Sequence, residues 1–465
     1  MKLTVNGSKF LDENGREVIL HGLNVLCRKA PHFYPEFEKA FPYFKQVGFN
    51  LLRFGVFWRA VEPEPGVIDE EYLQHVKKIL QLAEEYGIYI MIDMHQDLFA
   101  DKYGDGAPDW ACLDEGLYHP KNCALWYQAY LESDAIIRAA DNFWDNKPAS
   151  DGIGLLDHYE KMWQKIAEVF ADCENVIGLE PMNEPFMGSV ARQAFGEATM
   201  AAMQKNPSFS LTDPSTYEPQ EVASFMGIVA GKFLEWDKTV LMDFYHRIAH
   251  ALIKAGEVTG RVFPLITGGN IYCSTDLPTG ISRLEEIEQI YAPHGYDSVV
   301  DSDRYENYSK DNVERLYANK KLAADALALP TIAAEWGAFP SKDFTNDLIR
   351  FMNGIVEQNL WGSAYCEYHP GMEKDPNFTA LCRAYPRAVS GHLLSYRYDE
   401  KAAAFTMQIK AKLGTNEIYL PFTPATVTAD LPIRYEMDNA GDPESPQTVL
   451  KLEVLEEGPV TVSIR

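Results

Sequence analysis

Two glutamates that end apolar segments have the clearest chemical potential in this chain. Glu184 lies in LEPMNEP (residues 179–185), and Glu335 lies in TIAAEWG (residues 331–337). Two carboxyl groups about 5 Å apart, one protonated and one ionised, can cleave a glycosidic bond with retention of configuration. A lone glutamate at a strand end is more often a salt-bridge partner, but Asn183 beside Glu184 can also bind a sugar hydroxyl. We therefore predict Glu184 as acid/base and Glu335 as nucleophile.

The elements that must position these residues follow a repeating pattern. Short apolar or β-branched runs are each followed by polar loop residues and then by a stretch of helical period, which is typical of parallel β/α units. Eight such runs predict an α/β protein of the TIM (β/α)8 barrel class. The predicted strands are Val18 to Asn24, Asn50 to Phe57, Tyr89 to Met94, Val176 to Met182, Val262 to Thr267, Gln289 to His294, Thr331 to Glu335 and Gly362 to Tyr365.

Helical segments are expected between these strands. Their apolar residues recur at spacings of three and four, which suits helices packed on a barrel wall. The expected helices include Glu70 to Tyr86, Leu155 to Ala171, Val222 to Trp236, Asp243 to Ala255, Val313 to Ala326 and Asp347 to Gln358. In this arrangement Glu184 ends the fourth strand and Glu335 ends the seventh, so both reach the carboxyl rim of the barrel, where barrel enzymes hold their catalytic groups.

Two connections are longer than a barrel requires. Residues 97–146 are rich in aromatic side chains, and residues 186–243 contain a turn-rich piece followed by an apolar helix. Loops that follow barrel strands surround the active site. Their aromatic residues can stack on sugars, line a groove for a lipid, or simply pack on each other.

The last part of the chain has a different pattern. From about Ser395 onward, short alternating segments are separated by Gly, Pro and Asn or Asp turns, which predicts a small antiparallel β-sandwich. We place the catalytic barrel at residues 1–385 and the sandwich domain at residues 386–465. The first residues alternate like a hairpin with its turn at residues 13–15.

Composition narrows the function classes. The formal charge of −26 over 465 residues, without a basic run, argues against a nucleic-acid partner. No apolar stretch resembles a signal peptide or a membrane span, so we expect a cytoplasmic protein without stable membrane insertion, or a secreted one if a leader has been removed. The seven cysteines are widely spaced and interpreted as mostly reduced thiols. No cofactor is expected, and no metal site either, because the histidines do not form a ligand set.

The motifs resemble glycoside hydrolase family five of the cellulase superfamily. Asn-Glu-Pro follows the predicted fourth strand, and Glu-x-Gly follows the seventh. Within that family the chain is most similar to the endoglycoceramidases. The similarity includes DMHQD, GAPDWA, DNFW, MNEPF and YPRAV, and it extends to TNEIYLP in the C-terminal part, so it spans nearly the whole chain.

The resemblance implies roles for further residues. Arg53 would keep Glu335 ionised, and Tyr296 would hydrogen-bond the same carboxylate. His294 would orient Glu184. Sugar hydroxyls in the cleaved subsite would be bound by His95, Asp97, Asn183 and, as a weaker candidate, Lys29. One position departs from the family, because an aromatic floor under the sugar ring is replaced by Cys366; Tyr365, Tyr368, Trp361 or Trp336 are possible substitutes.

The predicted function is a retaining β-glycosidase that acts on a glycolipid or another glycoside. The resemblance implies an endoglycoceramidase-like enzyme that releases a sugar or oligosaccharide from ceramide. Alternatives within the same class are a β-glucosidase acting on steryl or other small glucosides and an endoglucanase acting on β-glucan. A catalytically silent sugar- or lipid-binding protein is the alternative from another class; the intact pair of glutamates argues against it.

Overall fold

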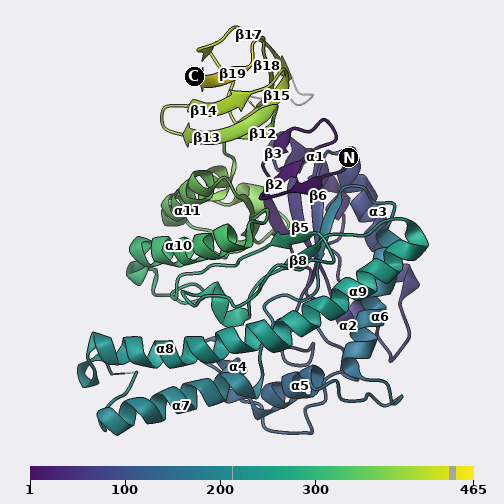
Figure 1. Cartoon of the computed structure of the whole chain (residues 1–465), viewed down its shortest axis with the longest axis vertical. Coiled ribbons are helices and arrows are strands. Elements are labelled where there is room, and N and C mark those ends of the chain that lie inside the picture. Colours follow the sequence, from purple (N-terminus) through teal and green to yellow (C-terminus); the bar gives the residue numbers. More distant parts are fainter. Residues whose placement is uncertain (212, 439–446) are drawn as a thin grey trace.

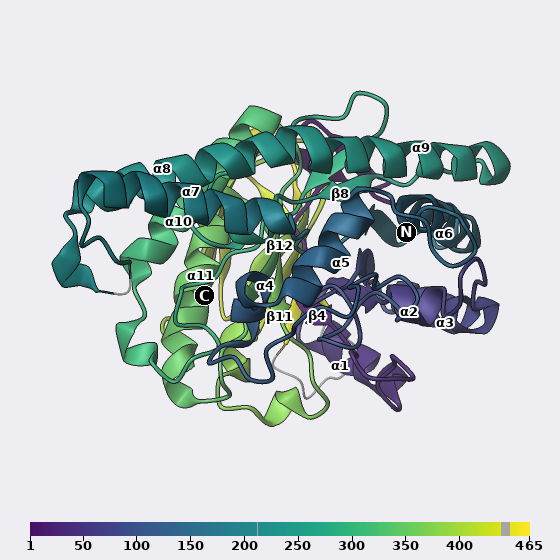
Figure 2. The same ribbon diagram turned by 90° about the horizontal axis from the view of Figure 1, so that it is seen from below.

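The computed structural model describes residues 1–211, 213–438 and 447–465. A barrel with its surrounding helices forms the body of the molecule, and a smaller β-structure lies at one end of it (Figure 1). Seen from the opposite end, helices and loops surround the central strands (Figure 2). The predicted class, a TIM barrel with a C-terminal antiparallel β-sandwich, is confirmed.

The barrel is one eight-stranded sheet in the order β10-β11-β4-β5-β6-β7-β8-β9. Its strands are β4 (His21–Val25), β5 (Leu51–Val56), β6 (Tyr89–Met94), β7 (Val176–Glu180), β8 (Leu265–Thr267), β9 (Gln289–Tyr291), β10 (Ile332–Gly337) and β11 (Gly362–Cys366). Each of the eight predicted segments contains or overlaps one of them. Every residue of these strands is buried, because a parallel sheet in this fold is covered on both faces.

The barrel closes between β9 and β10. Parallel bridges join Tyr291 to Thr331 and His294 to Glu335, and the Gly295 N–H donates to the Glu335 carbonyl oxygen at 3.1 Å. This closure brings the chain after β9 directly beside Glu335. It therefore places His294 and Tyr296 next to the predicted nucleophile.

The helices cover the outside of the barrel and form a projection beside its carboxyl rim. Their bounds are α1 (Phe41–Gln46), α2 (Trp58–Val61), α3 (Glu70–Glu85), α4 (Ala129–Glu132), α5 (Asp134–Trp144), α6 (Leu155–Phe170), α7 (Ser189–Lys205), α8 (Pro219–Trp236), α9 (Met242–Thr259), α10 (Lys310–Leu327) and α11 (Asn346–Asn359). The six predicted helices are α3, α6, α8, α9, α10 and α11. Helix α7 was not predicted; it lies beside α8, and the two extend to one side of the molecule (Figures 1 and 2).

The second β-structure contains two antiparallel sheets, one of seven strands (β1-β2-β3-β12-β15-β18-β17) and one of four (β13-β14-β19-β16). Their strands are β1 (Thr4–Asn6), β2 (Lys9–Leu11), β3 (Glu17–Val18), β12 (Tyr385–Val389), β13 (Gly391–Asp399), β14 (Ala404–Ala411), β15 (Gly414–Leu420), β16 (Val427–Ala429), β17 (Ile433–Asp438), β18 (Thr448–Val454) and β19 (Gly458–Ile464).

The N-terminal hairpin is present as predicted. Its pairing with a strand from the last part of the chain was not predicted. Strand β3 pairs with β12 through Val18 and Ala388, so the first strands extend a sheet built mainly from the last part of the chain. The predicted domain boundary at 385/386 falls inside β12 and stays a prediction.

The sandwich is fixed to the amino end of the barrel by two tyrosines. The Tyr385 hydroxyl donates to the Gly48 carbonyl oxygen at 2.6 Å, and the Tyr419 hydroxyl donates to the Gln46 carbonyl oxygen at 3.2 Å. Gly48 has a φ of +85°, and a Cβ there would lie 2.5 Å from the Tyr419 ring. Glycine is therefore required both by the backbone conformation and by the close approach of the ring.

Within the described residues, none of the helices combines the length and the apolar character needed to cross a bilayer.

Candidate active site

The two predicted catalytic carboxyl groups meet at the carboxyl rim of the barrel. Glu335 lies within β10, and Glu184 lies in the loop after β7. One carboxylate oxygen of each and a ring nitrogen of His294 all lie within 4.8 Å of one another. That separation matches the spacing of about 5 Å used by retaining glycosidases and is shorter than the ~6.5–9.5 Å of inverting enzymes.

Arg53 is the centre of the site. This fully buried side chain, from β5, occupies the barrel interior below the two glutamates. Its nitrogens approach the side-chain oxygens of five residues, at distances of 2.6–3.1 Å: Asn24, Asp93, Glu180, Asn183 and Glu335. A buried guanidinium is stable only when acceptors bind its N–H groups and opposite charges balance its own. Here these partners come from β4, from β6, from β7 and the loop after it, and from β10.

The carboxylate of Glu335 is held ionised. Oε2 accepts a hydrogen bond from Arg53 at 2.8 Å, and Oε1 accepts one from the Tyr296 hydroxyl at 2.7 Å. Burial raises the pKa of Glu335, but the charges of His294 and Arg53 outweigh burial and hold the pKa at about 2. Glu335 therefore has the charge state that a nucleophile needs at neutral pH.

His294 lies between the two glutamates. Its Nδ1 is 3.0 Å from Oε1 of Glu184 and 3.9 Å from Oε2 of Glu335, and its Nε2 is 3.7 Å from Oε1 of Glu180. Burial lowers the pKa of His294, but the charge of Glu335 and hydrogen bonds to Glu180 and Glu184 raise it to about 9. A protonated imidazole here compensates part of the negative charge that Glu180 and Glu335 concentrate at the rim.

The loop that carries Glu184 is held by Asn183 and Gln96. Glu184 has a φ of +40°, an unusual conformation for a residue with a side chain. The Gln96 amide donates to the carbonyl oxygens of Asn183 at 2.8 Å and Glu184 at 3.1 Å, and the Asn183 amide donates back to the Gln96 carbonyl oxygen at 3.0 Å. These reciprocal bonds keep the strained residue in one conformation.

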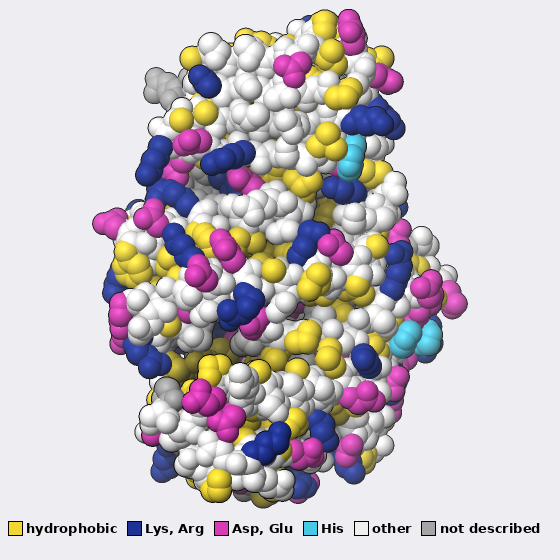
Figure 3. Space-filling model, turned by 60° about the vertical axis from the view of Figure 1, so that its left-hand side comes forward, with side chains coloured by type: hydrophobic (Ala, Val, Ile, Leu, Met, Phe, Trp, Pro, Cys, Tyr) yellow, Lys and Arg dark blue, Asp and Glu magenta, His cyan; other side chains and the backbone are white. Residues whose placement is uncertain are grey.

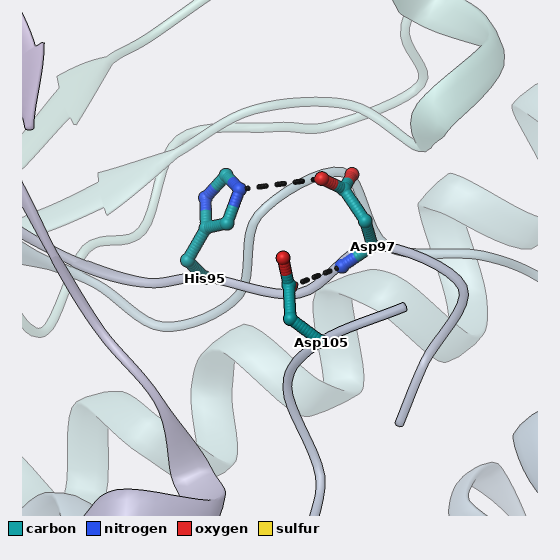
Figure 4. Close-up of side chains that lie close together, drawn as sticks. All are labelled: His95, Asp97 and Asp105. Atoms are coloured by element: carbon teal, nitrogen blue, oxygen red, sulfur yellow. Dashed lines mark hydrogen bonds and ion pairs between the residues drawn. The ribbon is translucent and has the colours of Figure 1, made fainter. Parts of the chain in front are cut away.

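His95, Asp97 and Asp105 form a second cluster (Figure 4). Nε2 of His95 lies 3.5 Å from Oδ2 of Asp97, and the Asp97 backbone N–H donates to Asp105 at 2.7 Å. Burial lowers the pKa of His95, but the adjacent Asp93 raises it well above its ordinary value. The protonated ring donates from Nδ1 to Asp93 at 2.8 Å and directs Nε2 toward Asp97 (Figure 4).

Each cluster has the residue types that could hold a metal ion. In the second cluster the Arg28 guanidinium already lies 3.2 Å from Asp105 and 3.6 Å from Asp97, where it supplies the positive charge that these carboxylates need. In the first cluster Arg53 and His294 do the same. The arrangement therefore fits hydrogen bonding to a polar ligand better than metal coordination. The sequence-based expectation of no metal site stays a prediction.

One cavity of about 1060 Å³ joins these groups. Glu184, Glu335, Asp97 and Tyr296 line it, and Arg53, His95, Asn183 and His294 lie directly behind them. Lys29 is the exception: its side chain is exposed, and the neighbouring Arg28 lines the cavity instead. Cys366 also lines it, together with Tyr365, one of the four aromatics proposed as a substitute floor; Trp336, Trp361 and Tyr368 do not.

Sequence reasoning missed four residues that shape the site: Arg28, Gln96, Glu180 and Ser274. Gln96 and Glu180 could have been predicted from the sequence, because each is a polar residue at or just after the end of an apolar strand and near a proposed site residue. Arg28 lies in an irregular loop and Ser274 at the end of a one-turn helix, and in neither place does the sequence determine which side chain faces the cavity.

A (β/α)8 barrel with two carboxyl groups this close at its rim, one held ionised, is the architecture of a retaining glycoside hydrolase. The family model "Cellulase (glycosyl hydrolase family 5)" matches residues 11–360, and the model "Glycoside hydrolase family 5 C-terminal domain" matches residues 383–462. The chain therefore belongs to glycosyl hydrolase family 5, which confirms the resemblance and the enzyme class inferred from the sequence.

Similar proteins include two animal endoglycoceramidases. The one from Hydra vulgaris is 31% identical over 450 residues, which cover 85% of this chain and 75% of that protein. The one from Cyanea nozakii is 32% identical over 215 residues, so the match spans only 41% of its length. Among solved structures, an iminocyclitol complex of endo-glycoceramidase II from Rhodococcus sp. superposes with a TM-score of 0.77 at 25% identity, covering 98% of this chain and 99% of that one.

Proposed function

We propose that this enzyme hydrolyses the β-linkage between a sugar and the apolar aglycone of a glycolipid, with a glycosphingolipid as the substrate. Glu335 is the nucleophile and Glu184 the acid/base. The observation that carries the proposal is the mixed lining of the cavity, which is apolar beside Glu184 and also contains a charged group made of Arg28, Asp97, Asp105 and Glu367.

Beside Glu184 the cavity wall is aromatic and aliphatic. The Ser274 hydroxyl contacts Glu184, and the same short helix η5 (Ile271–Ser274) presents Ile271 and Tyr272 to the cavity. From α4, Tyr130 and Leu131 line the cavity, and the Tyr130 ring lies 4.7 Å from that of Phe186, two residues after Glu184. Hydrophobic side chains also gather around a hollow on one face of the molecule (Figure 3). The acid/base adjoins the leaving group, so this wall fits an apolar aglycone.

Another part of the lining is charged. Arg28 pairs with Glu367 at 2.7 Å and with Asp105 at 3.2 Å, and Asp97 completes the group. Fixed carboxylates and a guanidinium offer both acceptors and donors to sugar hydroxyls. Because the nucleophile attacks the sugar, the polar end of the cavity is the correct side for the glycone.

The geometry gives each group one task. The ionised Glu335 attacks the anomeric carbon while the protonated Glu184 gives its proton to the departing oxygen, and a covalent glycosyl ester forms. Glu184 then removes a proton from water, which hydrolyses the ester and restores Glu335. Asn183 uses one amide N–H on the Gln96 carbonyl oxygen, which leaves the second for the sugar hydroxyl next to the reacting carbon.

The relatives support the same substrate class, since the Hydra and Cyanea proteins are both endoglycoceramidases. The test is a parallel assay of one glycosylceramide, one steryl glucoside and one soluble β-glucan at matched detergent concentration. We expect the highest kcat/KM on the glycosylceramide. A higher value on the steryl glucoside or on the glucan would reject the glycosphingolipid assignment while leaving the glycosidase class intact.

A further inference from the structure

A short segment of chain, residues 273–275, contacts Glu184 directly and is linked to Glu335 through Tyr296. The Ser274 hydroxyl hydrogen-bonds Oε1 of Glu184, the oxygen that also faces His294. The Ser274 carbonyl oxygen accepts from the Tyr296 N–H at 3.0 Å, and the Tyr296 hydroxyl in turn donates to Glu335. Ser274 therefore links the acid/base to the residue that holds the nucleophile.

The two neighbouring carbonyl groups are held by one buried amine. Nζ of Lys320, from α10, donates to the carbonyl oxygens of Cys273 at 2.6 Å and of Thr275 at 3.3 Å. Only 5% of Lys320 is exposed. Burial lowers the pKa of Lys320 to about 8, although the nearby Cys273, Asp276 and Glu184 raise it, so the amine is still mostly protonated at neutral pH. A buried ammonium needs acceptors, and here it finds them on either side of Ser274.

Further contacts hold the rest of this loop. The Asp276 carboxylate accepts from Arg315 at 2.7 Å and from Asn319 at 2.6 Å, both on α10. At its base, the buried Asp237 accepts from Asn270 at 2.7 Å and from the Gly280 N–H at 2.8 Å. The loop is thus fixed at both ends, and Lys320 acts at the point nearest Glu184.

We propose that Ser274 is a positioning residue for the proton of Glu184 and that Lys320 keeps Ser274 in place by clamping the carbonyl groups on either side of it. This inference rests on the proposed role of Glu184 as acid/base. The Ser274 hydroxyl donates to Oε1 of Glu184, which leaves the proton of the acid on Oε2 for the departing oxygen in the first step, and the same donor stabilises the carboxylate that must deprotonate water in the second. An alanine at this position could do neither.

The decisive measurement is a ratio of activities. For each variant, kcat/KM is measured on a glycosphingolipid, whose leaving group needs a proton, and on a dinitrophenyl β-glucoside, whose leaving group does not. Ser274→Ala is expected to lower the first value roughly ten- to a hundredfold, the size of effect expected for one hydrogen bond to a charged group, and to change the second by less than about threefold. The alkaline limb of its pH profile should also move toward higher pH, because the ionised carboxylate loses a donor.

Lys320→Met is expected to lower the ratio of kcat/KM on the glycosphingolipid to kcat/KM on the dinitrophenyl glucoside. The double variant Ser274→Ala/Lys320→Met should have a ratio no lower than that of the more damaged single variant, because both substitutions remove the same interaction between Ser274 and Glu184. Lys321→Met is the matched control: this lysine is next to Lys320 on α10 but pairs at the surface with Asp325. It should keep the parent ratio. If Lys320→Met is not recovered folded, Lys320→Gln, which retains one donor, should give an intermediate ratio.

Parent-like ratios for Ser274→Ala, or multiplicative losses in the double variant, would overturn the proposal. Glu184→Ala separates this failure from that of the proposed function. If Glu184→Ala shows the large ratio change and Ser274→Ala does not, only the positioning role is lost. If Glu184→Ala itself shows no dependence on the leaving group, the assignment of the acid/base fails.

Discussion

The Tyr296 hydroxyl donates to Oε1 of Glu335 at 2.7 Å, on the opposite oxygen from the one that Arg53 binds. Both oxygens of the proposed nucleophile are therefore fixed before substrate arrives. Attack on the anomeric carbon consequently needs little rearrangement of the carboxylate, which is a general advantage of preorganised sites.

Glu335→Gln should fold and lose several orders of magnitude in kcat, even on an aryl β-glycoside, because the amide cannot form the glycosyl ester. A fluorosugar that traps the intermediate should label Glu335 in the parent protein. Mass-spectrometric recovery of the label on a different carboxylate would contradict the assignment.

Glu184→Ala should be slow on a glycosphingolipid and should recover much of the first step on a dinitrophenyl glycoside, whose leaving group needs no proton. Azide should accelerate turnover of the second substrate, since it replaces the water that has lost its base. Equal losses on both substrates, with no effect of azide, would show that another residue is the acid/base.

Leu131→Asp should test the apolar end of the cavity. We expect kcat/KM on a glycosylceramide to fall more than about tenfold, because a charge is introduced where the lipid is bound, and activity on a soluble aryl glycoside to stay near the parent value. Leu117→Asp is the control, because Leu117 belongs to the same long connection but is 40% exposed and does not line the cavity. Similar losses in both variants would argue against a lipid contact at Leu131.

His294 should make stability depend on pH in the alkaline range. Its pKa is about 9 in the folded protein and ~6.5 in an unfolded chain, so its contribution is fully present below pH ~6.5 and is lost as pH rises toward 9. The free energy of unfolding of the parent should therefore fall more steeply over this window than that of His294→Gln, with both measured by urea denaturation. Taking the difference cancels the titration of other groups, Lys320 among them, and parallel slopes would contradict the prediction.

Gly48→Ala should test the contact between barrel and sandwich. The substitution adds a clash with the Tyr419 ring to the cost of a positive φ, whereas Gly87→Ala, at a φ of +72°, meets only a flexible arginine end at 3.9 Å. The second variant should lose about 1–2 kcal/mol of unfolding free energy, and the first clearly more. Equal losses in denaturant titrations would mean that the ring moves aside at no cost.

Local patterns predicted the strands well because each strand is an apolar run that a barrel buries on both faces. They also led to Glu184 and Glu335, although the structure places Glu335 within β10 and Glu184 in the loop after β7, whose last residue is Glu180. Helix α7 was missed although Ala191, Ala194 and Ala198 are buried on one face of it. Alanine at a helical spacing is a weak apolar signal, because each side chain buries little surface.

Contacts between residues far apart in the chain could not be predicted from the sequence. The choice between Arg28 and Lys29 depends on how an irregular loop turns, and neighbouring residues there carry no periodic signal. Ser274 acquires its position from Lys320 and Asp237, which lie on other elements. The pairing of β3 with β12 joins residues from opposite parts of the chain, and neither strand specifies its partner by composition.

This pairing has a consequence for how the chain is made. Strand β3 leaves the ribosome long before β12. Val18 therefore cannot pair with Ala388 until almost the whole barrel has been synthesised. At ~5–20 residues per second, the wait is on the order of twenty seconds to about a minute. During that time the edge of β3 that will bind β12 is unpaired and open to other strands. The sandwich is therefore the part of this molecule most exposed to misassembly during synthesis, whereas the barrel can begin to assemble as its β/α units emerge.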